Sequence, residues 1–535
     1  MIAERLHVAL DLPRAVRVGL AVGGGLLCAI AFPPRDVGPV AFVGLVPLFL
    51  ALEETSPWQA VWLGYAAGLS FYLATIWWVI NTMTTYGQMP LPLSLVALLL
   101  LGGVLAAYTA VFAGLLVAGR HWLRFPRGME PLVAAGLWVA LEFLRTYLFS
   151  GFPWALLGYS QYRQPTVRLL AAAAGVYGIS ALLVLTNGTL AGLLALSLEA
   201  REWTVRWRAS MLPVGLAALA VLATVGYARL LWRDPTGGAA VRVGLLQGNI
   251  DQSVKWDRSY QTATLDIYER LVWRVAAEKP ALIVWPETAV PFFLRREPEL
   301  STRVYRLIAE TGVPMLVGSP DVGEDGRLYN TAFLLGRDGQ IRGRYDKRHL
   351  VPFGEYVPLH QIFFFLDKLV VGIGDFGRGH RASVFSLDGT RFSVMICYEV
   401  IFPGEVREFV RDGAEFLVNI TNDAWFGRSG APSQHLAMAA MRAVENGTYL
   451  VRAANTGISA VIAPTGEILA QTGIFTEAAL LGTIHPRRAE TPYTRYGDGL
   501  AWTALAFLAA YVLALLSARW RHATPISRGS DRAIE

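Results

Sequence analysis

The feature that most constrains the fold is a series of long apolar stretches, because a helix needs about 20 mainly apolar residues to cross a bilayer. About eight candidate spans lie near residues 15–33, 38–52, 59–80, 91–118, 130–149, 168–198, 210–232 and 498–518. Composition agrees, since only 16% of the residues are charged, against about 25% in soluble domains. The sequence therefore predicts a multi-pass α-helical membrane domain.

The distribution of arginines predicts the orientation of these spans. With the N-terminus in the cytoplasm, the inner side carries Arg5, Arg14, Arg17, Arg120, Arg124, Arg127, Arg201, Arg206, Arg208, Arg519, Arg521, Arg528 and Arg532. The short outer loops hold only Arg35 and Arg163, with Arg168 at a boundary. This bias follows the positive-inside rule, so we expect both termini inside and the segment between spans seven and eight outside. A cleaved signal peptide is the alternative for the first span, but no A-x-A-like site follows residues 30–32, and we expect an anchor.

The segment 236–488 has a different pattern and divides the chain into a membrane domain at 1–235, this domain, and a last span with its tail at 489–535. Its apolar runs are short, as strands are, and lie at residues 241–246, 281–285, 314–317, 332–335, 392–396, 416–420 and 458–463. Residues 260–278 and 435–446 are typical of helices. Strands that alternate with helices predict an α/β domain.

Three chemically capable side chains follow predicted strands in this domain, where α/β proteins usually build their sites. Glu287 and Cys397 come directly after apolar runs, and Lys347 follows a turn and a short strand. A carboxylate that takes a thiol proton yields an attacking thiolate, and an ammonium stabilises the oxyanion that then forms. Taken singly, such a cysteine is more often a buried small residue, and the two charges are more often ordinary surface groups.

The setting of these residues in the chain decides between the two interpretations. In order and spacing they match the Glu–Lys–Cys pattern of the nitrilase superfamily, and with the membrane spans the chain resembles the bacterial apolipoprotein N-acyltransferase family. The resemblance includes Gln247-Gly248-Asn249-Ile250, Trp285-Pro286-Glu287-Thr288, Phe353-Gly354-Glu355-Tyr356-Val357-Pro358, Cys397-Tyr398-Glu399, Thr421-Asn422-Asp423-Ala424-Trp425-Phe426-Gly427 and Arg452-Ala453-Ala454-Asn455-Thr456-Gly457. It implies an extracytoplasmic nitrilase-like domain, an α-β-β-α sandwich.

The resemblance also implies roles for single residues. Glu287 is the general base, Lys347 the oxyanion stabiliser, Cys397 the nucleophile and Glu355 a supporting carboxylate. Tyr398 and Glu399 flank the nucleophile, and backbone N–H groups near Tyr398 are further candidates for binding the oxyanion.

Four aromatic residues are expected near the substrates by the same resemblance: Trp154, Trp256, Trp425 and Phe426. Trp256 has a plain alternative as a packing residue. Trp425 and Phe426 fit a membrane-facing lid, or an anchor at the headgroup level, where aromatic residues concentrate. Within span five, Glu142 and Arg145 are spaced for an i,i+3 ion pair, although charges inside a membrane often have functions.

The implied reaction moves a fatty acyl chain from a membrane phospholipid, by analogy phosphatidylethanolamine, through a Cys397 thioester to the α-amino group of an S-diacylglyceryl-cysteine of an apolipoprotein. This is the final step of lipoprotein maturation at the bacterial inner membrane, with the catalytic domain periplasmic. We expect a monomer with no cofactor, metal or nucleic acid, since His349, His360, His380 and His435 lack ligand spacing.

Two other functions use the same scaffold. One is a membrane-tethered amidase or nitrilase that hydrolyses small amides, because water then replaces the amine as the second nucleophile. The other is a non-enzymatic lipid or lipoprotein receptor, which intact Glu287, Lys347 and Cys397 argue against. A transporter has little support, because the spans lack paired broken helices.

Overall fold

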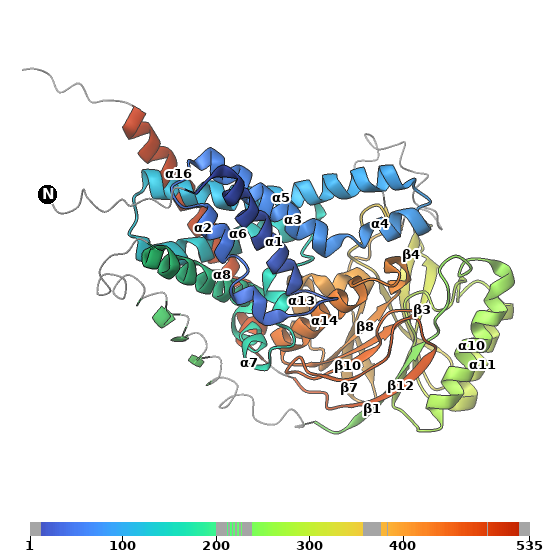
Figure 1. Cartoon of the computed structure of the whole chain (residues 1–535). Helices are drawn as coiled ribbons and strands as arrows, with labels where there is room; N and C mark the ends of the chain where they lie inside the picture. The colour runs from blue at the N-terminus through green and yellow to red at the C-terminus, as the bar shows by residue number, and fades with distance from the viewer. Residues whose placement is uncertain are drawn as a thin grey trace, which may run out of the picture.

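The computed structural model describes residues 12–198, scattered positions between 211 and 226, and residues 238–356, 376–381, 383–488 and 490–523. Helices of the membrane domain lie on one side of the molecule and two β-sheets on the other (Figure 1). The longer membrane helices are α1 (Arg14–Ile30), α3 (Pro57–Ile76), α5 (Leu91–Trp122), α6 (Glu130–Tyr147), α8 (Ala171–Leu198) and α16 (Gly499–Ala523). The shorter ones are α2 (Val46–Ala51), α4 (Val79–Asn81), α7 (Pro165–Arg168) and α15 (Pro492–Tyr496).

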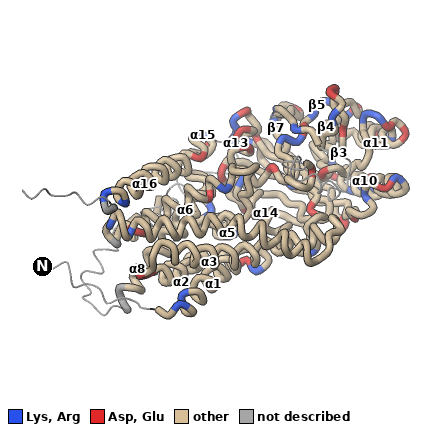
Figure 2. Tube along the Cα trace, turned by 90° about the horizontal axis from the view of Figure 1, so that it is seen from above, with Lys and Arg blue, Asp and Glu red and all other residues tan. Residues whose placement is uncertain are grey.

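Within the described residues, four helices are long and apolar enough to cross a membrane, and a bent pair makes a fifth. They cover the expected spans three to six and eight. The first expected span falls on α1, which has 17 residues, and the second falls on the short helices between Gly38 and Ala51. The seventh lies mostly outside the described residues. The helix bodies carry few charges, whereas both signs are mixed over the sheet domain (Figure 2).

The third span is broken rather than straight. Helix α3 ends at Ile76, and the chain continues through α4 into a single π-helical segment, Thr82–Tyr86, with a bend of 56°. π-helical segments disturb the regular hydrogen-bond ladder and kink a helix. The bend directs α4 over the sheet domain (Figure 1), where α4 and the π-helical segment contact Asp423–Phe426.

The sheet domain contains two six-stranded sheets. The first has the order β12-β1-β2-β3-β4-β5 and the second the order β11-β10-β9-β8-β7-β6. Their strands are β1 (Val241–Gln247), β2 (Leu282–Val284), β3 (Met315–Val322), β4 (Leu328–Leu335), β5 (Ile341–Asp346), β6 (Val384–Leu387), β7 (Thr390–Ile396), β8 (Phe416–Thr421), β9 (Tyr449–Ala454), β10 (Ala460–Ile462), β11 (Ile468–Gln471) and β12 (Ala478–Ile484). In each sheet the three parallel strands lie together, β1-β2-β3 and β7-β8-β9.

The two sheets pack face to face, and helices cover their outer faces (Figure 1). Helices α10 (Arg258–Ala276) and α11 (Pro298–Thr311) cover the first sheet, and α13 (Pro403–Arg411) and α14 (Ala431–Asn446) cover the second. This is the expected α-β-β-α sandwich. Helix α14 is buried along nearly its whole length because α8 of the membrane domain packs on it as well as the sheet.

Candidate active site

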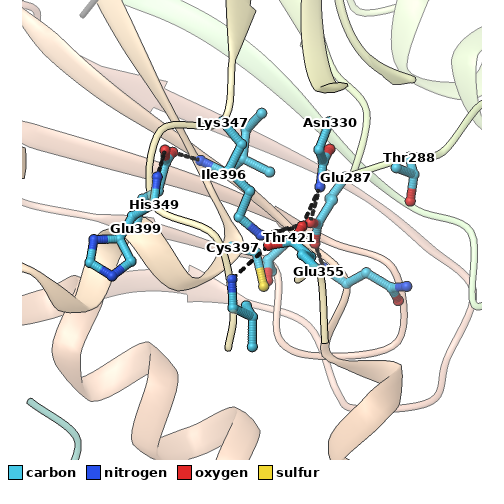
Figure 3. A network of polar contacts seen from close by, with 12 residues as sticks. Glu287, Thr288, Asn330, Lys347, His349, Glu355, Ile396, Cys397, Glu399 and Thr421 are labelled. Atoms are coloured by element: carbon cyan, nitrogen blue, oxygen red, sulfur yellow. Dashed lines mark hydrogen bonds and ion pairs between the residues drawn. The ribbon is translucent and has the colours of Figure 1, made fainter. Parts of the chain in front are cut away.

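Cys397 lies at the carboxyl end of β7, at the start of a 3-10 turn that runs to Ile401. Its φ is +53°, a left-handed conformation that costs a residue with a Cβ about 1–2 kcal/mol. Such strain persists where the surroundings hold it, and it concentrates at functional sites. The side chain is half-buried, and the sulfur faces a group of charged residues from the other sheet (Figure 3).

This group consists of Glu287, Lys347, Glu355 and an asparagine, Asn330. The Lys347 ammonium is 2.9 Å from Glu355 Oε1 and 3.4 Å from Glu287 Oε1. Asn330, on β4, donates its amide to the same two atoms, at 2.7 Å to Glu287 and 3.1 Å to Glu355. One lysine and one amide thus hold two carboxylates side by side (Figure 3).

Electrostatics define the resting state of the nucleophile. Burial, together with the Glu287 carboxylate, raises the pKa of the Cys397 thiol to about 12. Burial also lowers the pKa of Lys347, but the carboxylates of Glu355 and Glu287 outweigh it and hold that pKa well above its usual value. At neutral pH the site therefore contains a protonated thiol and a charged lysine ammonium.

Glu399 joins the nucleophile turn to the segment that follows Lys347. One carboxylate oxygen accepts the Ile396 N–H at 2.6 Å, and the other accepts the N–H groups of Arg348 at 2.6 Å and His349 at 3.2 Å. Burial raises the pKa of Glu399 to about 7. Because its carboxylate binds backbone N–H groups next to Cys397 and next to Lys347, Glu399 fixes the distance between these two backbone segments.

The membrane domain contributes directly to the surroundings of Cys397. Tyr398 donates its hydroxyl to the Gly151 carbonyl at 3.4 Å. The buried Trp154 has its ring centre 5.7 Å from that of Phe426. Trp425 is half-buried, and its ring lies 5.4 Å from Tyr86 in the π-helical segment. The structure thus brings Trp154, Trp425 and Phe426 together above the second sheet.

Trp256 follows Lys255 beside the loop of Glu287. It is half-buried, with Lys255 Nζ 5.9 Å from its ring centre. The buried Lys255 donates to Thr288 Oγ1 at 2.5 Å and to the Glu287 carbonyl at 3.1 Å. Burial lowers the pKa of Lys255 to about 8. Lys255 therefore supports the loop that carries Glu287, and Trp256 flanks that loop.

Glu142 and Arg145 differ from the simple ion pair that their spacing suggests. Arg145 donates to the Trp154 carbonyl at 2.8 Å, and Glu142 accepts the Leu157 N–H at 2.8 Å. Both side chains are buried. They therefore hold the loop that presents Trp154.

The sequence analysis missed Asn330 and considered His435 only in arguing against a metal site. An asparagine inside an ordinary strand pattern carries little signal until its partners are known. Cys28 and Cys397 are both free, and among the described residues no group of three or more His, Cys, Asp and Glu is arranged to hold a metal ion.

Comparison with known proteins agrees with this architecture. Residues 24–189 match the model of the apolipoprotein N-acyltransferase N-terminal domain, and residues 242–493 match that of carbon-nitrogen hydrolases. An apolipoprotein N-acyltransferase of Geobacter metallireducens is 43% identical over 94% of this chain and 95% of its own. This chain belongs to the apolipoprotein N-acyltransferase family.

Other relatives extend the comparison. The apolipoprotein N-acyltransferase of Methylococcus capsulatus is 38% identical over 94% of this chain and 97% of its own. Among solved structures, an amidase of Nesterenkonia AN1 from the nitrilase superfamily is 20% identical, with a TM-score of 0.38, and matches 50% of this chain and 96% of its own. A nitrilase-superfamily protein of Saccharomyces cerevisiae is 19% identical, with a TM-score of 0.37, over 55% of this chain and 97% of its own.

Proposed function

We propose that this protein transfers a fatty acyl chain from a membrane phospholipid to the α-amino group of the S-diacylglyceryl-cysteine of an apolipoprotein. The observation that carries the proposal is the meeting of Cys397, Glu287 and Lys347 at one edge of the sandwich, near aromatic residues to which the membrane domain contributes Trp154. Both substrates are lipid-anchored, so a site tied to membrane helices meets them where they reside.

The first half-reaction forms a thioester. Glu287 takes the thiol proton as Cys397 Sγ attacks the ester carbonyl carbon, and Lys347 stabilises the resulting oxyanion. The carbon–oxygen bond of the ester then breaks, and the leaving alcohol of the lysophospholipid takes the proton from Glu287. Glu355 and Asn330 hold the side chains of Lys347 and Glu287 in position during these steps.

The second half-reaction returns the site to its starting state. The acceptor's α-amino group attacks the thioester carbonyl, the carbon–sulfur bond breaks, and the sulfur regains a proton by way of Glu287. An amide is more stable than a thioester, so the transfer is favourable. Water must be kept out meanwhile, and the aromatic cover of Trp154, Trp425 and Phe426 suits that requirement.

Finer assignments belong to the same proposal. We take phosphatidylethanolamine as donor, a monomer as the working unit, and an orientation with both termini cytoplasmic and the sheet domain periplasmic. The arginine bias supports the orientation. Trp256 flanks the route to Glu287, and the loop of Trp425 and Phe426 acts as a lid over Cys397.

Intact-mass measurement of the purified protein with phosphatidylethanolamine tests the first half-reaction. We expect a gain of one fatty acyl group, removed by hydroxylamine and absent from Cys397→Ala. Adding a diacylglyceryl-cysteinyl peptide should then discharge the enzyme and yield acylated peptide. Release of fatty acid with no acylated peptide would instead indicate a hydrolase, the amidase-like alternative.

A further inference from the structure

A buried polar cluster lies directly beneath the nucleophile and has no part in the steps above. It consists of Asp423, His435 and Arg452, whose exposed fractions are 1%, 0% and 0%. His435 Nε2 is 3.2 Å from the Cys397 carbonyl oxygen, and His435 Nδ1 is 3.0 Å from Asp423 Oδ1. Arg452 Nη2 is 2.7 Å from Asp423 Oδ2 and 2.9 Å from His435 Nδ1. A fully buried histidine thus touches the backbone of the reacting residue.

The contacts of Arg452 decide which ring nitrogen of His435 carries the proton. A guanidinium group only donates hydrogen bonds, so the Nδ1 atom that faces Arg452 is the acceptor. The ring proton is then on Nε2 and is donated to the Cys397 carbonyl. With the proton on Nε2, one contact is repulsive, that between the Nδ1 lone pair and Asp423 Oδ1. With the proton on Nδ1, two contacts are repulsive: the Nδ1 N–H faces an Arg452 N–H, and the Nε2 lone pair faces the Cys397 carbonyl oxygen.

The charges of the cluster agree with a neutral ring. Burial and the Arg452 guanidinium lower the pKa of His435. Burial raises the pKa of Asp423, but Arg452 and His435 outweigh it and hold that pKa well below its usual range. The Arg452–Asp423 ion pair therefore stays charged, and His435 stays a neutral donor.

The carbonyl that His435 contacts belongs to the same planar peptide unit as the Tyr398 N–H, because the C=O of one residue and the N–H of the next share one amide. A hydrogen bond to the oxygen of an amide polarises it and strengthens the N–H as a donor. It also fixes the direction in which that N–H points. The strained φ of Cys397 requires such fixing, which Glu399 supplies on the Ile396 side.

We propose that His435 is a positioning residue that holds and polarises the Cys397–Tyr398 peptide, so that the Tyr398 N–H shares the oxyanion with Lys347. His435 itself gives up no proton, and the bonds made and broken remain those of the acyl transfer. The inference rests on the proposed function for its donor, and it adds the group that orients the backbone oxyanion donor expected near Tyr398.

The pair His435→Asn and His435→Gln tests the hydrogen bond from His435 Nε2 to the Cys397 carbonyl. Asparagine keeps an acceptor near Nδ1 for Arg452 but has no atom at the position of Nε2, whereas glutamine places an amide N–H there. Removing one oxyanion donor costs about 100- to 1000-fold in rate, and weakening it costs less. We expect acylation of His435→Asn by saturating phosphatidylethanolamine to be about 10- to 100-fold slower than wild type, and that of His435→Gln within about 5-fold of it.

Alkylation of Cys397 by iodoacetamide separates a role in oxyanion binding from a structural role. The thiol displaces iodide from a saturated carbon in this reaction, so no oxyanion forms. We expect His435→Asn to react with iodoacetamide within about 2-fold of wild type. Met441→Ala, a packing change on the same buried helix, should leave the ratio of acylation to alkylation unchanged. Wild-type acylation in His435→Asn, or an equal loss of both reactions, would overturn the proposal.

Failure of the proposed function would look different from failure of this inference. If wild type takes no acyl group from phosphatidylethanolamine, the donor assignment fails before any variant is compared. The same variants can then be acylated with p-nitrophenyl butyrate, an ester that also forms an oxyanion. A selective loss in His435→Asn with this donor still supports the role of His435, and no loss refutes it.

Discussion

At the residue scale, the distinctive property of the site is a thiol that burial and Glu287 keep protonated until it reacts. The pKa of Cys397, about 12, lies far above neutral pH, so a preformed thiolate is scarce. In the proposed mechanism, attack therefore depends on the Glu287 carboxylate, which takes the proton at the moment of reaction.

Glu287→Gln removes that carboxylate and should change how alkylation by iodoacetamide responds to pH. Without a base, the reaction must pass through free thiolate, whose fraction rises about tenfold per pH unit below the pKa. We expect that slope between pH 7 and 9 in Glu287→Gln and a much shallower slope in wild type. Identical slopes would contradict a general base at Glu287, and phospholipid acylation of the variant should fall at least 100-fold.

Asn330 is the second residue whose substitution should slow acylation. In Asn330→Ala, Glu287 and Glu355 lose the amide that both accept, and Lys347 is left to bridge their Oε1 atoms. We expect acylation to slow by about 10-fold or more, measured as acyl-enzyme formation by intact mass. Thr331→Val is the control, because the Thr331 hydroxyl binds Asp346 instead. Equal losses in both variants would assign the effect to the strand rather than to the amide.

The sequence indicated the candidate catalytic residues more readily than the side chains that hold them. Glu287, Lys347 and Cys397 were found because each follows a strand in a setting that matches a known family pattern. Asn330 and His435 lie inside a strand and a helix whose patterns are ordinary, and their partners come from distant segments. Such contacts appear only when the chain has folded.

At the element scale, apolar runs predicted the strands that are buried on both faces and missed many of the others. All seven predicted runs overlap strands, among them β1, β2, β7 and β8. The short strand expected before Lys347 is β5. Strands β6, β11 and β12 went unpredicted, because edge and hairpin strands alternate exposed and buried residues and form no continuous run. β9 is buried but was also missed, since Arg452 interrupts its apolar pattern.

Gly427 ends the turn that carries Trp425 and Phe426, with φ +59° and ψ −160°, a region essentially restricted to glycine. A Cβ there would also collide with the Asn81 side chain of the bent third span. If this loop is the lid, Gly427→Ala should raise the phosphatidylethanolamine concentration for half-maximal acylation several-fold and leave alkylation by iodoacetamide unchanged.

Gly389→Ala is the matched control for that variant. Gly389 has φ +86° and open space around its Cβ position, in the turn between β6 and β7. Both changes strain the backbone by about 1–3 kcal/mol, but only Gly427 lies beside the aromatic cover of Cys397. A similar rise in both variants would mean that general destabilisation, and not the lid, limits the donor.

At the scale of the whole molecule, one side chain of the sheet domain makes four hydrogen bonds to the membrane domain. Gln434 on α14 accepts the indole N–H groups of Trp78 at 3.2 Å and Trp154 at 2.7 Å. Its amide donates to the carbonyls of Pro33 at 2.8 Å and Thr75 at 3.0 Å. Helix α14 is thus an internal element shared by the membrane helices and the second sheet, so the side of the membrane on which Cys397 lies follows from the orientation of the membrane helices.

That orientation is open to a direct test in cells whose outer envelope is permeabilised and whose inner membrane is intact. In a Cys28→Ala, Cys397→Ala background, Asp388→Cys places a thiol at an exposed turn of the sheet domain, and Ser530→Cys places one in the C-terminal tail. Because arginines mark the cytoplasmic side, we expect a membrane-impermeant maleimide to label position 388 at once and position 530 only after lysis. Labelling of position 530 in intact cells, with position 388 protected, would invert the topology and would put the site on the wrong side for periplasmic lipoproteins.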